Sequence, residues 1–278
     1  MNVVIYTQIV GKARSEKDRK FLILKFTTMP PHKIKTPPFL PSIFTSGNLF
    51  CGLLAIIEAF NGNYYRGAWL IILAGFFDSI DGMVARLTHQ YSRFGAELDS
   101  LSDLISFVLA PMILIYPLTL KSLGIWGNLT AFVFVVAGAI RLARFNANLK
   151  SLTEKEIFHG LPTPAAGGAV ASFLLFNNAV YYDLTMLRFI PLVIILLSIL
   201  MVSNIEYPPI PKLAAGSLKS YLVYAGFLLA LIGIIMKPNL TIFPILTGYI
   251  VFGLIWRVYK SSHIERWKNK RRKNVADS

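Results

Sequence analysis

Long apolar runs separated by short polar turns dominate the chain from residue 38 onward. A membrane-spanning helix needs about 20 mostly apolar residues, and eight segments of the chain meet that need. They cover residues 38–60, 66–86, 96–119, 123–145, 162–181, 187–204, 218–236 and 239–258. The pattern predicts an all-α, polytopic membrane protein with about eight transmembrane helices.

The distribution of lysine and arginine predicts how these helices are oriented. Eight spans place both termini on one side of the membrane, so alternate loops fall on the far side. Those far-side loops contain few basic residues, namely Arg66, Lys121, Arg188 and Lys237. Because positive charge concentrates in cytoplasmic segments, we expect both termini to lie in the cytoplasm.

Basic segments flank the apolar region at both ends. Residues 1–36 carry eight Lys or Arg and end in a proline-marked entry to the first span. Residues 261–278 form a second basic segment. We therefore expect three parts: a cytoplasmic arm over 1–36, a transmembrane domain over 37–260 and a cytoplasmic tail over 261–278. Contact with anionic lipid is one role for the arm, and simple disorder is the alternative.

Composition supports a membrane protein over a soluble or nucleic-acid-binding one. Hydrophobic residues make up 55% of the chain, charged residues 15%, and the mean hydropathy is +0.57. The net charge of +14 lies at the termini and between apolar runs, so the bilayer surface explains it better than a nucleic acid does. The single cysteine, Cys51, excludes a disulfide framework and a cysteine metal site.

Four aspartates crowd into a short stretch that joins the second and third spans. Asp78 and Asp81 are three residues apart, and Asp99 and Asp103 are four apart, so each pair shares one helical face. The intervening residues 87–94 predict a polar turn between antiparallel helices. The four carboxylates can therefore converge at the cytoplasmic edge of the membrane.

Such a cluster requires compensating positive charge. An aspartate at the centre of a spanning helix costs about 2.5–3.5 kcal/mol on insertion scales, and the nearby cations are Arg86, His89 and Arg93. A pair of divalent ions compensates more completely. Because the available ligands are oxygens, a hard ion, Mg²⁺ or Mn²⁺, is expected.

Two other interpretations of the spacing are open. The aspartates can pair with arginines and simply fasten the helices, or they can form the ion site of a divalent-cation transporter. Gly82 and Gly95 favour a bound ligand, since the absence of a Cβ lets a bulky group approach the helix backbone beside the carboxylates.

The eight key positions together resemble the signature of the CDP-alcohol phosphatidyltransferases. The match runs D-x-x-D-G-x-x-A-R, eight residues, then G-x-x-x-D-x-x-x-D, and every defining position is filled: Asp78, Asp81, Gly82, Ala85, Arg86, Gly95, Asp99 and Asp103. Three further segments are similar to one branch, the bacterial-type phosphatidylserine synthases. They are PSIFTSGNLFCG (41–52), RLARFN (141–146) and GLPTPAAG (160–167).

The resemblance implies a helical bundle of the CDP-alcohol phosphotransferase type and a reaction. Residues 37–260 become its catalytic domain, which transfers a phosphatidyl group from CDP-diacylglycerol to L-serine and releases CMP. Asp78, Asp81 and Asp99 ligate two divalent ions, and Asp103 completes the acidic centre and acts as general base. A homodimer in the cytoplasmic membrane is also implied.

The resemblance implies contacts for both substrates. The CDP-lipid site contains the small residues, one arginine and two residues of the first span: Gly82, Ala85, Gly95, Arg86, Thr45 and Asn48. The acceptor site contains Arg141, Arg144 and Asn146, whose alternative role is anchoring at the membrane surface. Other acceptors (glycerol 3-phosphate, inositol phosphate or choline) and an archaeal-type lipid donor stay open.

Overall fold

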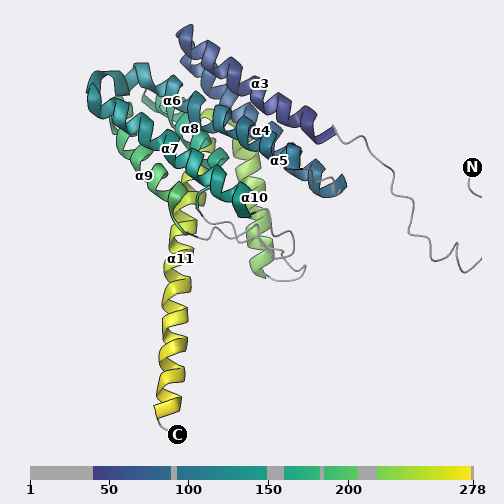
Figure 1. Cartoon of the computed structure of the whole chain (residues 1–278), viewed down its shortest axis with the longest axis vertical. Helices are drawn as coiled ribbons and strands as arrows, with labels where there is room; N and C mark the ends of the chain where they lie inside the picture. Colours follow the sequence, from purple (N-terminus) through teal and green to yellow (C-terminus); the bar gives the residue numbers. More distant parts are fainter. Residues whose placement is uncertain (1–39, 89–92, 149–159, 182–184, 206–217, 277–278) are drawn as a thin grey trace, which may run out of the picture. The chain divides into compact units, whose positions relative to one another are not determined.

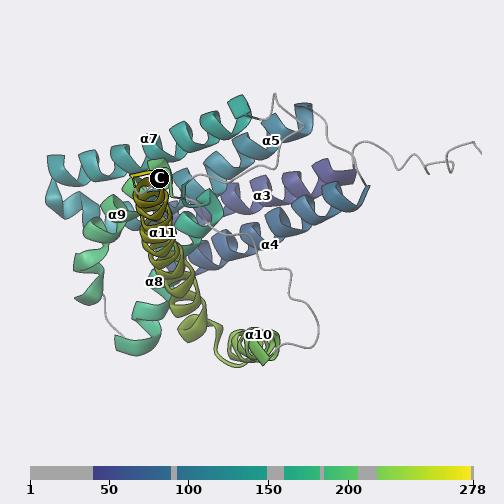
Figure 2. The same cartoon turned by 90° about the horizontal axis from the view of Figure 1, so that it is seen from below.

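The computed structural model describes residues 40–88, 93–148, 160–181, 185–205 and 218–276. The predicted arm over 1–36 and residue His89 lie outside these ranges. The described residues contain helices and no strand, which confirms the predicted all-α class. Figures 1 and 2 show the helices from two directions.

Helical segments occupy all eight of the predicted spans. In chain order they are α3 (Leu40–Phe60), α4 (Tyr64–Thr88), α5 (Arg93–Asp103), η1 (Leu104–Leu109), α6 (Ala110–Ile115), η2 (Tyr116–Leu120), η3 (Lys121–Leu123), α7 (Ile125–Asn148), α8 (Thr163–Tyr181), η4 (Thr185–Phe189), α9 (Ile190–Val202), α10 (Leu218–Met236) and α11 (Pro238–Ala276). The predicted tail over 261–278 therefore begins as a continuation of α11.

Five of these segments are long and apolar enough to cross a membrane among the residues described. They are Ser42–Phe60, Tyr64–Leu87, Phe94–Leu123, Ile125–Ala147 and Pro238–Arg257. The segment Met186–Val202 is apolar but shorter, and α8 is largely buried inside the protein. These helices indicate a membrane protein. Among the described residues, fewer helices than the predicted eight are both long enough and apolar enough to cross a membrane.

The third span is not one regular helix. Wide π-helical turns interrupt it at η1 and η2, with Pro111 just after the first and Pro117 inside the second. Proline lacks an N–H donor and clashes with the carbonyl four residues earlier, so the regular hydrogen-bond ladder cannot continue through either position. The first wide turn begins directly after Asp103, which places it against the predicted site.

Close helix contacts build the core. Helices α3 and α4 lie side by side in both views (Figures 1 and 2), with Ala55, Ala59 and Ala68 buried in this part of the core. Helix α8 packs against η1 and α11, and α7 packs against α9. Small residues let helix backbones approach closely in membrane proteins, and these alanines serve that purpose here.

The entry to α8 is fixed to the end of α9. Gly160 has φ +84° and its N–H donates to the Ile205 carbonyl at 2.8 Å, while the Leu161 N–H donates to the Leu200 carbonyl at 3.0 Å. A Cβ on Gly160 would lie 2.3 Å from the Met201 oxygen, so both the backbone angle and the space require glycine. This anchor sets where the first turn of α8 lies.

Gly167 permits the closest approach of α8 to η1 and provides a test of the packing. A Cβ there would lie 2.3 Å from the Phe107 carbonyl oxygen, whereas a Cβ on Gly168 would meet only the Leu246 side-chain tip at 3.3 Å. We expect Gly167→Ala to destabilise the protein by about 1–3 kcal/mol through overpacking. Gly168→Ala is the matched control and should leave thermal unfolding in detergent nearly unchanged. Equal melting temperatures for the two variants would contradict this account of the helix contact.

Candidate active site

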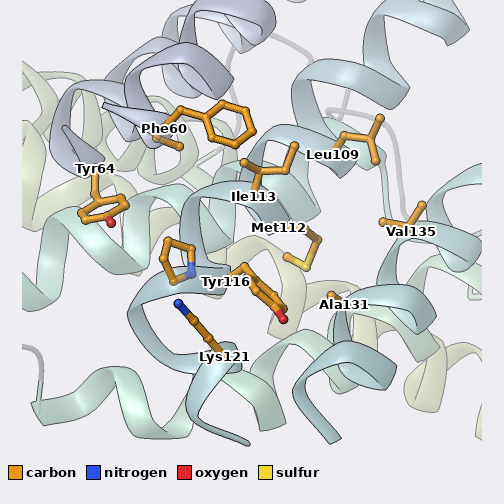
Figure 3. Close-up of a pocket in the computed structure, with 11 residues that line it drawn as sticks. Phe60, Tyr64, Leu109, Met112, Ile113, Tyr116, Lys121, Ala131 and Val135 are labelled. Atoms are coloured by element: carbon orange, nitrogen blue, oxygen red, sulfur yellow. The ribbon is translucent and has the colours of Figure 1, made fainter. Parts of the chain in front are cut away.

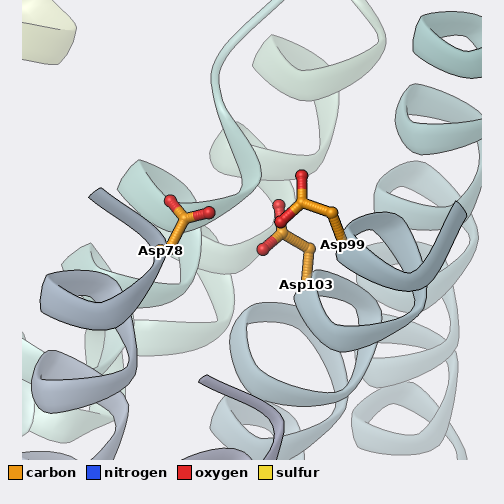
Figure 4. Close-up of side chains that lie close together, drawn as sticks. All are labelled: Asp78, Asp99 and Asp103. Carbon is orange, nitrogen blue, oxygen red and sulfur yellow. The ribbon is translucent and has the colours of Figure 1, made fainter. Parts of the chain in front are cut away.

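Three carboxylates from two helices meet at one point. Asp78 of α4 and Asp99 and Asp103 of α5 each contribute an oxygen, and these oxygens all lie within 4.8 Å of one another. Figure 4 shows the Asp78 carboxylate facing the other two across a short gap. Asp103 is buried, while Asp78 and Asp99 are partly exposed. The predicted convergence of the two helical faces is therefore present for these three residues.

Asp81 lies beside this cluster and is engaged by the first span. Its Oδ2 accepts a hydrogen bond from Thr45 Oγ1, and its side chain is buried. It is close enough to Asp78 and Asp99 for their charges to interact. The structure thus brings Asp78, Asp99 and Asp103 into one cluster and places Asp81 next to it, and all four belong to the predicted metal site.

Both oxygens of Asp103 accept hydrogen bonds from other helices. Asn48 Nδ2 of α3 donates to Oδ1 at 3.2 Å, and Thr163 Oγ1 of α8 donates to Oδ2 at 3.3 Å. A carboxylate held by two donors from different helices has little freedom to rotate. Asp103 is therefore the most firmly oriented member of the cluster.

Two serines position the first span beside the aspartates. Ser102 Oγ donates to the Thr45 carbonyl at 3.1 Å, and Ser106 Oγ donates to the Asn48 carbonyl at 2.9 Å. All four of these residues are buried. The serines therefore place Thr45 and Asn48, whose side chains reach the carboxylates.

Arg141 brings a positive charge to the cluster. Its Nη1 donates to Thr163 Oγ1 at 2.9 Å, and its guanidinium is close enough to Asp103 and Asp78 for electrostatic attraction. Its Nε is buried without a hydrogen-bond partner among the described residues. Arg141, Thr163 and Asp103 thus form a continuous polar chain from α7 through α8 to α5.

The other predicted acceptor residues lie in different surroundings. Arg144 is exposed, and its Nη1 donates to the Val202 carbonyl at the end of α9 at 2.8 Å. Asn146 Nδ2 donates to Glu97 Oε2 at 2.9 Å, and Asn146 Oδ1 accepts from Ser100 Oγ at 3.0 Å. In this structure Arg141 faces the aspartates, Arg144 contacts the end of α9, and Asn146 joins α7 to α5.

Four of the predicted CDP-lipid residues lie on α4 and α5, while Thr45 and Asn48 lie buried on α3. Gly82 is exposed, and the nearest atom to a Cβ built there would be Arg86 Nη2 at 4.0 Å. Arg86 is also exposed, while Ala85 and Gly95 are partly buried. The face of α4 at Gly82 is thus free for a ligand to approach the backbone.

The donor set fits a hard divalent cation. The clustered ligand atoms are all carboxylate oxygens, which suit Mg²⁺ and Mn²⁺ better than softer metals. The site contains four carboxylates, three in the cluster and that of the neighbouring Asp81. The described residues place one guanidinium close to them, that of Arg141. The negative charge therefore exceeds the positive charge at the site, and a bound cation would correct the imbalance.

One residue that contacts the cluster directly was not among the predicted site residues, although the resemblance to the synthases implies that its segment lines the polar pocket. Thr163 follows Pro162 at the first turn of α8, a position where a threonine usually caps the helix and a proline starts it. A pattern typical of a helix start does not indicate a contact with Asp103, because that contact depends on how α8 packs. The only signal in the sequence was its place in the GLPTPAAG segment.

Comparisons with known proteins find similar sequences in one family. A family model described as CDP-alcohol phosphatidyltransferase matches residues 38–198. A Helicobacter pylori protein named CDP-diacylglycerol–serine O-phosphatidyltransferase is 34% identical over 235 residues, which cover 83% of this chain and 95% of the relative. A Bacillus subtilis protein of the same name is 35% identical over 66% of this chain and 97% of its own length. A Methanothermobacter thermautotrophicus archaetidylserine synthase is 36% identical over 68% and 78%.

The geometry predicts which carboxylates bind a cation. Asp99→Asn removes one charge from the cluster, and we expect Mn²⁺ affinity to fall by about tenfold or more, since even changes to residues behind a metal ligand cost about 10- to 100-fold. Glu97→Gln is the matched control, because Glu97 lies two residues away on the same helix and bonds Asn146 instead. Titration of Mn²⁺ by electron paramagnetic resonance measures both affinities. Similar losses in the two variants would show that general surface charge, rather than the cluster, attracts the ion.

Proposed function

The chain belongs to the CDP-alcohol phosphatidyltransferase family, and on that premise we propose that it transfers the phosphatidyl group of CDP-diacylglycerol to the hydroxyl of L-serine. The products are phosphatidylserine and CMP. The observation that carries the proposal is the meeting of Asp78, Asp99 and Asp103 at the end of two apolar helices. Relatives with high coverage are named for this reaction.

The reaction is an in-line displacement at phosphorus. The serine oxygen forms a bond to the phosphorus that carries diacylglycerol, and the bond from that phosphorus to the CMP oxygen breaks. The serine hydroxyl proton passes to a carboxylate, and the electron pair of the broken bond leaves on CMP. The protein forms no covalent bond to the substrates in this reaction. Its contribution to catalysis is therefore mainly to position the substrates and to compensate their charge.

The acidic cluster supplies the charge-compensating site. Members of this family use a divalent metal, and we assign two ions, Mg²⁺ or Mn²⁺, to Asp78, Asp81 and Asp99, with Asp103 at their side. When bound, such ions neutralise the diphosphate and stabilise the entering and leaving oxygens. The protein contributes the gathered carboxylates.

Asp103 is assigned as the general base. Its two hydrogen bonds, from Asn48 and Thr163, favour the ionised carboxylate and fix its direction. Arg141 stands behind Thr163 and attracts the same negative charge. A carboxylate held in this way can accept the serine proton without first reorienting.

The CDP-lipid would lie over α4 and the start of α5. Gly82, Ala85 and Gly95 form a surface of small residues, and exposed Arg86 is available to a phosphate. Thr45 and Asn48, also assigned here, already bond Asp81 and Asp103. Their contribution to nucleotide binding is therefore to hold these two carboxylates in place from the first span.

The acceptor site is assigned to Arg141, Arg144 and Asn146. Arg141 is best placed of the three, since its guanidinium faces the aspartates and its Nε has no hydrogen-bond partner among the described residues. A serine carboxylate bound there would bring the hydroxyl toward Asp103. Arg144 and Asn146 would support this site by fastening α7 to α9 and α5.

We also propose that the protein is a homodimer in the cytoplasmic membrane. Both termini and the aspartates then lie on the cytoplasmic side. The low number of Lys and Arg in the opposite loops supports this orientation.

An archaeal-type lipid donor is the second candidate. The relative named archaetidylserine synthase is 36% identical over 68% of this chain, and the residues assigned above contact the polar part of the donor rather than its chains. The two candidates share one mechanism and one acceptor.

Release of CMP tests the function directly. Purified protein with CDP-diacylglycerol and Mn²⁺ or Mg²⁺ should release CMP with L-serine and much less with glycerol 3-phosphate, inositol phosphate or choline. The archaeal-type CDP-lipid is tested in parallel to separate the two donors. CMP release with glycerol 3-phosphate but not serine would refute the acceptor, and no release with any alcohol would refute the enzyme assignment.

Two substitutions separate the base from the metal ligands. Asp103→Asn should lower turnover by about 10²- to 10⁴-fold, the contribution of a positioned general base, while Mn²⁺ and CDP-lipid binding are retained. Asp78→Asn should lose Mn²⁺ affinity as well as turnover. Equal loss of Mn²⁺ binding in both variants would mean that Asp103 acts as a ligand instead of the base.

A further inference from the structure

A cavity lies at the end of the bundle away from the aspartates. Its volume is about 550 Å³, within the range of sites that hold small ligands. The lining residues are Ala59, Phe60, Tyr64, Leu109, Met112, Ile113, Tyr116, Pro117, Lys121, Ala131 and Val135. We call this cavity the distal groove.

The distal groove is separate from the candidate active site. Tyr64 begins α4, whereas Asp78 lies 14 residues further along the same helix, which corresponds to about 21 Å at 1.5 Å per residue. On α7 the groove residues Ala131 and Val135 precede Arg141. None of the four aspartates lines the distal groove.

Every lining residue falls within a candidate membrane span. The spans are Ser42–Phe60, Tyr64–Leu87, Phe94–Leu123 and Ile125–Ala147. The groove follows the third span from Lys121 near its end to Leu109, which lies nearer its middle. It therefore runs from the membrane surface into the hydrocarbon region.

The groove is apolar along its length and basic at one end. Figure 3 shows Phe60, Ile113 and Leu109 on one side of the cavity and Tyr116 and Lys121 on the opposite side. Among the described residues, the Lys121 ammonium has no hydrogen-bond or ion-pair partner, and the Tyr116 hydroxyl donates to Asn128 Oδ1 at 2.7 Å. Among the described residues that line the groove, the one charged side chain is thus the exposed Lys121, and none is a carboxylate.

We propose that the distal groove binds one anionic phospholipid of the leaflet opposite the active site. An acyl chain lies along Phe60, Met112 and Val135, and the lipid phosphate lies at Lys121. The ligand needs a long apolar part and a negative head, and a membrane lipid has both in this geometry. The site adds a lipid-binding function to the fold that is independent of the reaction at the aspartates.

A second copy of the chain fits the groove less well. A two-fold contact brings the same surface of both copies together, and the lining contains a lysine but no acidic residue. Such a contact would bury Lys121 without a counter-charge, which costs free energy. An anionic lipid supplies the missing charge.

Native mass spectrometry of the detergent-purified full chain tests the site, with phosphatidylglycerol and phosphatidylethanolamine as the probes. We expect one phosphatidylglycerol per chain to bind more tightly than phosphatidylethanolamine. Lys121→Gln should weaken phosphatidylglycerol about fivefold, the effect of one lysine near an anionic surface, and remove the preference. Ala131→Phe, which fills the groove, should weaken both lipids.

Two controls make the result specific. Lys237→Gln changes another exposed lysine, in the turn before α11, and should leave lipid binding unchanged. Asp78→Asn should also retain phosphatidylglycerol, because the distal groove is remote from the aspartates.

Three outcomes would overturn the proposal. The first is equal affinity for the two lipids with no effect of Lys121→Gln. The second is loss of phosphatidylglycerol in Asp78→Asn but not in Lys121→Gln, which would place the lipid at the aspartates. The third is a shift from dimer to monomer in Ala131→Phe with unchanged lipid binding, which would assign the groove to a second copy.

Discussion

The repulsion among carboxylates gathered in apolar helices is the constraint around which this structure is organised. Asp78, Asp99 and Asp103 present oxygens within 4.8 Å of one another, and Asp81 lies beside them. Each charge is costly within a membrane span, and their proximity adds to that cost. Donors on neighbouring helices offset part of that cost, and the cation proposed for this site would offset more.

Elements far apart in sequence meet that requirement together. Thr45 and Asn48 on α3 each donate to one aspartate, and Thr163 on α8 donates to Asp103 while it accepts from Arg141. The glycine anchor at Gly160 fixes the entry to α8, so the position of Thr163 depends on the end of α9. Packing at the centre of the bundle thus determines the orientation of a carboxylate at its edge.

The sequence predicted the helices and the gathering of aspartates because both follow from short-range rules. Apolar length locates the spans, and a separation of three or four residues places Asp78 with Asp81 and Asp99 with Asp103 on shared helical faces. The same rules could not show which three carboxylates meet most closely, since the rotation of α4 against α5 depends on tertiary packing. They also gave Thr163 only a local role at a helix start, because its partner is 60 residues away in the chain.

The divergence of Arg141 and Arg144 bears on the choice of acceptor. Three residues of spacing place both on one side of α7, yet Arg144 contacts the α9 carbonyl of Val202 while Arg141 faces the carboxylates. Within the described residues, the cluster therefore has one guanidinium, which is already attracted to Asp103 and Asp78. The proposed ions and Arg86 are assigned to the four aspartates and to the donor diphosphate. A phosphate-bearing acceptor would add about two further negative charges there, and the described residues bring no further arginine to the cluster to offset them. Serine brings one carboxylate and one ammonium, so its net charge is zero and the single Arg141 is sufficient. The excess of negative charge at the aspartates thus favours a zwitterionic acceptor over an anionic one.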